Sequence, residues 1–273
     1  MERIDSGGVS FAYELSDAGG KGTEPKGTVV LLNGVAMSIA HWKPVAAALT
    51  AAGFRVLCHD FRGQLLSDKP AGPYSLELHA RDLALLLDAL GLGGRVHLVG
   101  TSYGAEVALA FARDFPERAA SLCMVDGVCE ADAVLKAAVD AWKRAASAGP
   151  SLFYRTILPW NYSSAWLEAN AAAVAAREGA MASLPVSWYE SFVELCDAFL
   201  AIDLRKDLGR IACPTLVVAA ELDILKGPRY ARVMVEGISG ARYEEISGAG
   251  HAAVIEKPEE VARLALDFLA DIG

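Results

Sequence analysis

The chain has 273 residues, of which 53% are hydrophobic and 22% are charged, so neither a disordered nor a low-complexity protein is expected. Its formal net charge is −9 and it has no lysine and arginine cluster, which argues against a nucleic-acid partner because such partners need a basic surface. No apolar run reaches the roughly 20 residues that cross a bilayer, and no apolar leader follows Met1. We therefore expect a cytoplasmic protein with no membrane partner.

Strand patterns alternate with helix patterns over the first half of the chain. A hairpin is predicted over residues 2–17, and an exposed loop rich in glycine and lysine follows it over 18–27. Continuous apolar runs then predict central strands of a parallel sheet, because such strands are covered on both faces. Four of these strands are expected at 27–32, 55–59, 95–100 and 120–125, with helices at 44–52, at 75–90 and from Tyr103 onward.

The alternation returns near the C-terminus, with predicted strands at 214–220 and 241–246 and a last helix that opens at Pro258. Repeated strand and helix segments of this kind predict an α/β fold with a mostly parallel sheet and helices on both faces. One domain with an insertion suits this length.

Between Gly127 and Arg210 the alternation stops, and the sequence predicts helices at 131–146, 164–178 and 187–202. The last has a capping box from Ser187 to Glu190 and an apolar stripe formed by Trp188, Phe192, Leu195 and Phe199. We interpret residues 1–127 and 211–273 as the core, and residues 128–210 as a helical cap over the active edge of the sheet.

Four of the five tryptophans fall in this predicted cap. Most of them are expected to pack the small core of the cap itself. One or two are expected to line a substrate pocket, and Trp160 and Trp188 are the candidates.

The segment from Val96 to Ala110 runs an apolar strand into Gly-x-Ser-x-Gly and then directly into a helix. A serine between a strand end and a helix start lies on a sharp turn, so Gly100 and Gly104 must be nearly free of side chains. The turn exposes the hydroxyl of Ser102 at the carboxyl edge of the sheet. Ser102 is therefore the candidate nucleophile.

A serine hydroxyl needs a neutral imidazole that accepts its proton. His251 lies in a glycine-rich loop after the last predicted strand, where a general base can reach the serine. The other histidines lie within a predicted strand or helix, or near the sheet edge before the serine: His41, His59, His79 and His97. His251 is therefore the candidate base.

A carboxylate must orient that imidazole and stabilise its charged form. Asp223 follows the fifth central strand, and the chain order serine, aspartate, histidine is that of an α/β-hydrolase. Asp126 ends the preceding strand and remains the alternative. Each aspartate could instead cap a turn.

A tetrahedral intermediate needs two amide donors. The N–H of Tyr103 follows the nucleophile, and the N–H of Val35 lies in the loop after the first central strand, where Gly34 allows close approach. These two amides are the candidate oxyanion hole. Asn33, just before Gly34, is expected to contact the substrate.

Five motifs then fall in the right order across nearly the whole chain: Asn33-Gly34, Asp60-Phe61-Arg62-Gly63, Gly100-Thr101-Ser102-Tyr103-Gly104, Cys213-Pro214-Thr215-Leu216-Val217-Val218 with Asp223, and Gly250-His251. Together they resemble the α/β-hydrolase superfamily. The most similar group is that of the small capped serine hydrolases, which includes 3-oxoadipate enol-lactonases, carboxylesterases and carbon–carbon bond hydrolases. The resemblance implies acyl transfer to water without a cofactor.

The chain departs from that family pattern at three places. Asn33 replaces the usual histidine before the oxyanion residue, Gln64-Leu65 replaces the usual His-Gly, and Ala105 replaces a glycine after the nucleophile turn. The first two are similar to the rhamnolipid-pathway hydroxyacyl transferases, which share the fold and triad. No P-loop, dinucleotide fingerprint or HExxH motif is present, so no metal and no nucleotide cofactor is expected.

Three functions follow from this pattern. The first is a serine hydrolase of an ester or lactone with a small to medium apolar acyl group, acting through an acyl-enzyme on a small-molecule ester, lactone or thioester. The second is an acyltransferase or a carbon–carbon bond hydrolase with the same triad. The third is a ligand receptor with little turnover. The sequence leaves the oligomeric state open.

Overall fold

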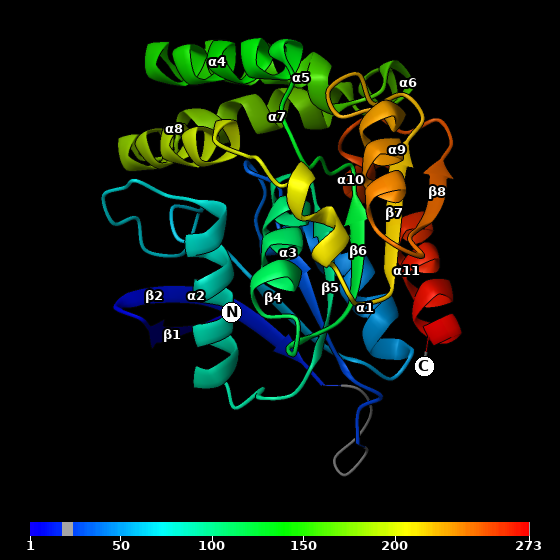
Figure 1. Cartoon of the computed structure of the whole chain (residues 1–273). Coiled ribbons are helices and arrows are strands. Elements are labelled where there is room, and N and C mark those ends of the chain that lie inside the picture. Colours follow the sequence, from blue (N-terminus) through cyan, green and yellow to red (C-terminus); the bar gives the residue numbers. More distant parts are fainter. Residues whose placement is uncertain (18–23, 273) are drawn as a thin grey trace.

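An eight-stranded sheet runs through the part of the chain that the computed structural model describes, residues 1–17 and 24–272 (Figure 1). Its strand order is β1-β2-β4-β3-β5-β6-β7-β8. The hairpin of β1 (Glu2–Ser6) and β2 (Val9–Ser16) pairs antiparallel with β4, and all other pairs are parallel. The remaining strands are β3 (Thr28–Leu32), β4 (Arg55–His59), β5 (Val96–Thr101), β6 (Ala119–Val125), β7 (Thr215–Ala220) and β8 (Arg242–Ile246). The predicted mostly parallel sheet is confirmed, and the loop predicted over 18–27 lies largely outside the described residues.

Strand β3 shows why the central strands are continuously apolar. Val30 and Leu32 pack into the core on one face of the sheet, while Val29 and Leu31 pack into the core on the other. Helices α2 (Leu76–Ala89), α3 (Tyr103–Asp114) and α9 (Pro228–Gly237) contribute to the first core, and α1 (Lys43–Ala51), α10 (Ala253–Glu256) and α11 (Pro258–Ile272) to the second. The sheet is therefore buried on both sides, as parallel sheets require.

Local signals fix the ends of these helices. The Ser75 side chain accepts a hydrogen bond from the amide of Leu78 at the start of α2, and Gly91 beyond its end has a φ of +70°. That positive φ suits glycine, which has no Cβ to clash. The predicted boundaries of α2 are thereby confirmed.

Helices also cover the carboxyl edge of the sheet, where the parallel strands end (Figure 1). They are α4 (Ala133–Ala148), α5 (Pro150–Asn161), α6 (Ser164–Ala169), α7 (Ala171–Ala182) and α8 (Val186–Leu200). Two short 3₁₀ helices, η1 (Ile39–Trp42) and η2 (Arg205–Arg210), complete the described elements. None of the described helices combines the length and apolar composition that a membrane span needs.

Three sequence predictions for this helical region were wrong in detail. Helix α5 was not predicted from the sequence; Pro150 occupies its first turn, where proline is tolerated, and Pro159 lies inside it. The helix expected at 164–178 is split at Asn170, which has φ −118° and ψ 24° and whose side-chain amide donates to the carbonyl of Trp166. Ser187 does not cap α8, because extended Pro185 already starts that helix.

Candidate active site

Ser102 occupies the turn between β5 and α3 with a φ of +51° and a ψ of −121°, a backbone conformation that a non-glycine residue seldom adopts. A Cβ atom added at Gly100 would lie 2.3 Å from the carbonyl oxygen of Gly104, and one added at Gly104 would lie 2.1 Å from that of Leu32. The two glycines therefore permit the turn by leaving room for backbone. This packing is the one that the Gly-x-Ser-x-Gly pattern predicts.

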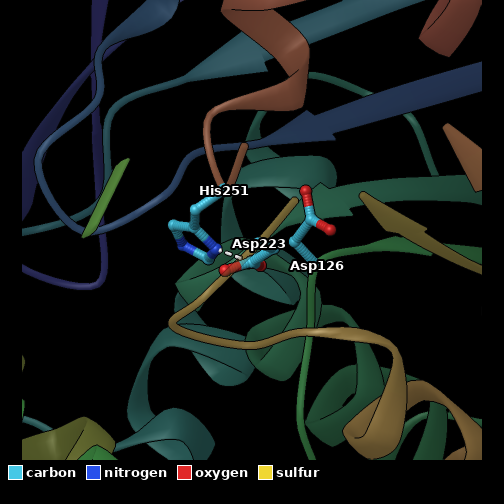
Figure 2. Close-up of side chains that lie close together, drawn as sticks. All are labelled: Asp126, Asp223 and His251. Carbon is cyan, nitrogen blue, oxygen red and sulfur yellow. Dashed lines mark hydrogen bonds and ion pairs between the residues drawn. The ribbon is translucent and has the colours of Figure 1, made fainter. Parts of the chain in front are cut away.

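His251 joins this serine to Asp223. The Nε2 atom of His251 lies 2.9 Å from Ser102 Oγ, and its Nδ1 atom lies 2.7 Å from Asp223 Oδ2. Figure 2 shows the bond between His251 and Asp223, which come from the loops after β8 and β7. With a proton on Nδ1, the imidazole donates to the carboxylate and accepts from the serine hydroxyl at Nε2.

The backbone holds Asp223 in place. Its Oδ1 atom accepts hydrogen bonds from the amides of Leu225 at 2.7 Å and Lys226 at 2.8 Å, which leaves Oδ2 for the imidazole. Asp223 and His251 are both buried. The carboxylate is thus fixed before any ligand arrives.

Asp126, the alternative acid, lies beside this hydrogen bond (Figure 2). Its Oδ1 atom accepts from the amide of Ala220 at 2.7 Å, and its Oδ2 atom has no partner among the described residues. Burial, together with the charge of Asp223, raises the pKa of Asp126 well above its usual range. His251 Nδ1 is bonded to Asp223 Oδ2, whereas Asp126 bonds to the backbone, so the geometry favours Asp223.

The donor atoms of Asp126, Asp223 and His251 lie within 4.8 Å of one another, which raises the question of a metal site. The distance of 2.7 Å between His251 and Asp223 is that of a hydrogen bond, and ligands of a tetrahedral zinc ion lie farther apart. This geometry suits a hydrogen-bonded pair better than it suits metal ligands.

The two candidate oxyanion donors border the serine. Val35 and Tyr103 line a small cavity of about 20 Å³ together with Ser102, and a Cβ added at Gly34 would lie 3.5 Å from Ser102 Cβ. In the described part of the chain, the amides of Val35 and Tyr103 donate to no protein acceptor. Both amides therefore remain the candidate donors for an oxyanion next to the serine.

Asn33 does not reach the site. Its side chain is fully buried, donates to Asp60 Oδ1 and Gln64 Oε1 at 3.0 Å, and accepts from the indole of Trp42. Gln64 in turn donates to the carbonyl of Gly34 at 2.8 Å. Asn33 therefore supports the loop of Gly34, and the expectation that it contacts substrate is wrong for this geometry, because all its side-chain bonds are internal.

Three of the other histidines, His59, His79 and His97, do not line the cavity in front of Ser102. His97 bonds to Ser121 at 2.9 Å and His79 to the hydroxyl of Tyr103 at 2.8 Å, both within the sheet and its covering helix. His59 is fully buried and its ring nitrogens have no partner among the described residues. Burial lowers the pKa of His59 to about 4 and, with a contribution from Arg62, that of His79 to about 3, so both are neutral at pH 7.

A cavity of about 280 Å³ opens in front of Ser102 and His251, beneath the helices that cover the sheet edge. Its wall is largely apolar and includes Trp188, as predicted from the sequence. Trp160 is not part of the wall; its ring is half-buried and packs against the main core. Trp142, which the sequence did not single out, contributes instead.

No pattern in the sequence pointed to three polar residues in this wall, His41, Tyr162 and Arg177. Arg177 Nη1 donates to the hydroxyl of Tyr162 at 2.5 Å, and Arg177 Nη2 to His41 Nε2 at 2.6 Å. His41 in η1 lies 136 residues before Arg177 on α7, so the folded chain, and no sequence pattern, brings these side chains together.

A buried ion pair lies behind the catalytic candidates. Lys226 Nζ contacts Glu106 at 2.8 and 3.0 Å, and it lies 4.3 Å from the centre of the Phe199 ring. Glu106 also accepts from the amide of Val128 at 2.9 Å. The pair therefore connects α3 with the loop that carries Asp223 and with the start of the helical region.

Comparisons with known proteins agree with this fold. A family model described as the alpha/beta hydrolase fold matches residues 27–258. A protein named as carbamate hydrolase RutD, from Azorhizobium caulinodans, is 31% identical over 275 residues, covering 100% of this chain and 99% of its own length.

Two solved structures have the same architecture. The enol-lactonase from Burkholderia xenovorans LB400 superposes with a TM-score of 0.87 at 26% identity, covering 98% of this chain and 100% of its own. A thermophilic esterase from Thermogutta terrifontis gives a TM-score of 0.86 at 26% identity, covering 100% of this chain and 99% of its own.

Proposed function

Because this chain belongs to the alpha/beta hydrolase fold family and is a hydrolase, we propose that it cleaves an ester or lactone through an acyl-enzyme on Ser102. The observation that carries the proposal is the continuous series of contacts from Ser102 Oγ to His251 at 2.9 Å and from His251 to Asp223 at 2.7 Å. A serine activated in this way attacks carbonyl carbon. No cofactor takes part in the proposed reaction.

In the first half of the reaction, Ser102 Oγ attacks the substrate carbonyl while His251 Nε2 takes its proton. Asp223 stabilises the resulting imidazolium through Nδ1. The carbonyl oxygen becomes an oxyanion that the amides of Val35 and Tyr103 bind, and each such donor is worth about 3 to 4 kcal/mol in the transition state. When the tetrahedral intermediate collapses, His251 gives the proton to the leaving alcohol.

In the second half, water takes the place of the alcohol. His251 removes a proton from the water as it attacks the acyl-enzyme, the same amides bind the new oxyanion, and Ser102 recovers its proton as the acid departs. The lining around Trp142 and Trp188 supports an apolar acyl group of small to medium size, given a cavity of about 280 Å³. We infer that residues 128–210 act as the cap that closes over this group.

A carbamate is the second candidate substrate. The name of the relative from Azorhizobium caulinodans, which matches over the whole chain, supports it. The serine attacks either carbonyl in the proposed mechanism, and the same amides bind either oxyanion, so product analysis must decide: ammonia released from a carbamate, or acid and alcohol released from an ester.

The proposal is tested with p-nitrophenyl esters of graded chain length, with simple lactones, and with a fluorophosphonate label. We expect turnover and stoichiometric labelling of the wild-type protein. Ser102→Ala should lose both, with kcat lower by roughly a millionfold, because the three side chains act as a unit. Labelling that persists in a folded Ser102→Ala variant would identify another nucleophile and refute the mechanism.

A further inference from the structure

We propose that the cavity selects substrates that carry a carboxylate group at a distance from the reacting carbonyl, and that Arg177 binds this carboxylate. The inference deepens the proposed function and rests on it in one respect: the ester must react at Ser102. It adds a charged specificity element to a wall that is otherwise largely apolar.

The first support is the charge of the wall. Arg177 on α7 lines the cavity together with Ser102 and His251, and no aspartate or glutamate lines it in the described part of the chain. Nor does any described carboxylate lie within ion-pair distance of Arg177, whereas Arg155 on the neighbouring α5 contacts Glu178 at 2.9 Å. A half-buried cation in apolar surroundings is unfavourable until an anion joins it.

The second support is the way in which the guanidinium group is held. Tyr162 Oη and His41 Nε2 accept from its two terminal nitrogens, and the Tyr162 ring is itself stacked on Trp166 with ring centres 4.2 Å apart. An arginine has five N–H donors, so these two bonds leave others for a ligand. Tyr162 and His41 thus position Arg177 without neutralising it.

The third support is the state of His41. Burial, together with the charge of Arg177, lowers the pKa of His41 to about 4, so its imidazole is neutral at pH 7. A neutral imidazole can accept from Arg177 at Nε2, which lies 2.6 Å from Nη2, while its Nδ1 atom lies 3.1 Å from the amide and 3.2 Å from the carbonyl of Ser38. Arg177 is the only arginine or lysine side chain in the described wall.

Planar guanidinium and carboxylate groups form parallel hydrogen bonds, which suit this role better than a point charge does. His41 in η1 follows the loop of Val35 closely in the chain, so the proposed carboxylate site and oxyanion site come from one short segment. A molecule with an ester at one end and a carboxylate at the other would occupy both.

The first experiment compares monomethyl and dimethyl esters of succinate, glutarate, adipate and suberate, which differ within each pair only in the free carboxylate. For at least one chain length, kcat/KM of the wild-type protein should favour the monoester. Arg177→Met should lower that kcat/KM by roughly 10- to 100-fold, the size of a hydrogen bond to a charged group, and change the diester less than about threefold. Arg177→Lys should restore part of the loss.

Arg144→Met is the matched control, because Arg144 is an exposed arginine of α4 that pairs with Asp140 outside the cavity. This substitution should leave kcat/KM unchanged for both the monoester and the diester. The proposal is overturned if the wild-type protein shows no monoester preference at any length, or if Arg177→Met slows both esters equally.

The second experiment needs no turnover and so separates this inference from the proposed function. Calorimetry on the Ser102→Ala variant should show that the monoester binds roughly tenfold or more tightly than the diester, and that adding Arg177→Met removes the difference. Equal binding of the two esters would refute the carboxylate site even if esters are hydrolysed. Selective binding without turnover in the wild type would retain the site and refute the proposed reaction.

Discussion

The carboxyl edge of the sheet and the helices above it contribute to the same cavity in different ways. At the sheet edge, Ser102, Asp223 and His251 are placed by backbone turns that directly follow β5, β7 and β8. In the covering helices, Arg177 and Trp188 are placed by packing between α5, α7 and α8. The proposed chemistry therefore depends on backbone turns that hold the reacting side chains in place. The proposed selectivity depends on the shape of the cavity wall that the covering helices form.

Burial shows the same contrast. Ten of the 12 residues of α3 are buried, whereas α7 has no buried residue at all. Changes in α3 disturb a packed core, which interiors tolerate poorly, while changes in α7 alter the cavity at little cost to folding. The following predictions test this division, from the largest expected effect to the smallest.

The largest expected effect concerns the two buried aspartates at the sheet edge, whose substitutions should lower kcat by very different amounts. Asp223→Asn should lower kcat by roughly four orders of magnitude, because an amide leaves the imidazole in the wrong tautomer. Asp126→Asn should lower it tenfold or less, since Asp126 bonds to the amide of Ala220 while His251 bonds to Asp223. Steady-state kinetics with one ester measures both.

The reverse ranking would move the acid to the loop after β6. Thermal unfolding of both variants serves as the control, since each replaces a buried carboxyl with a group of the same shape.

The covering helices should control substrate choice more than rate. Trp188→Leu enlarges the cavity, so the ratio of kcat/KM for long against short acyl chains should rise roughly tenfold, the value of about one methylene group. Trp160→Leu is the control and should leave the ratio unchanged, because that ring lies outside the cavity wall. Competition between p-nitrophenyl esters measures the ratio.

If Trp160→Leu shifts the preference as much as Trp188→Leu does, substrates occupy a space other than this cavity. If both variants only lose stability, the tryptophans serve as core of the helical region.

The smallest effect concerns stability in acid, which should arise in the sheet region because residues 128–210 contain no histidine. Buried His59 has its pKa lowered from 6.5 to about 4, so the unfolded chain binds a proton more readily than the folded one. Stability is therefore lost as the pH falls from 6.5 toward 4. The substitution His59→Phe should remove about 2 kcal/mol of the loss in unfolding free energy between pH 7 and pH 5.

Urea unfolding at the two pH values measures this difference. The aromatic neighbours Phe11 and Phe61 provide an apolar surrounding that accepts the new ring. If the variant loses as much unfolding free energy between pH 7 and pH 5 as the wild-type protein does, groups other than His59 cause the acid sensitivity.

The sheet region could be predicted from the sequence because its signals are local. A side chain at Gly100 would meet the carbonyl of Gly104, four residues away. Asp223 closely follows the apolar strand β7, and His251 lies in the glycine-rich loop after β8. The covering helices could not be predicted as well, because their limits depend on tertiary packing. Proline residues at 150 and 159 fall within α5, where position in the helix decides whether they break it.

The residues of the cavity wall were even harder to predict from the sequence. Nothing near Arg177 in the sequence distinguishes it from a surface arginine, and Asn33 differs from a substrate ligand only through its bonds to Asp60, Gln64 and Trp42. Which tryptophan faces the cavity depends on helix rotation, which single-sequence periodicity does not fix for a short helix. Long-range contacts therefore carry the information that the sequence pattern lacks.

The buried contact between Lys226 and Glu106 has a consequence for how this sequence can evolve. Replacement of either side chain alone strands the opposite charge in the interior, at a cost of about 3 to 5 kcal/mol, which is a large part of the stability of an ordinary domain. Replacement of both by apolar residues of similar volume is close to neutral. The two positions, 120 residues apart in the chain, can therefore drift only together, and each acts as a genetic constraint on the other.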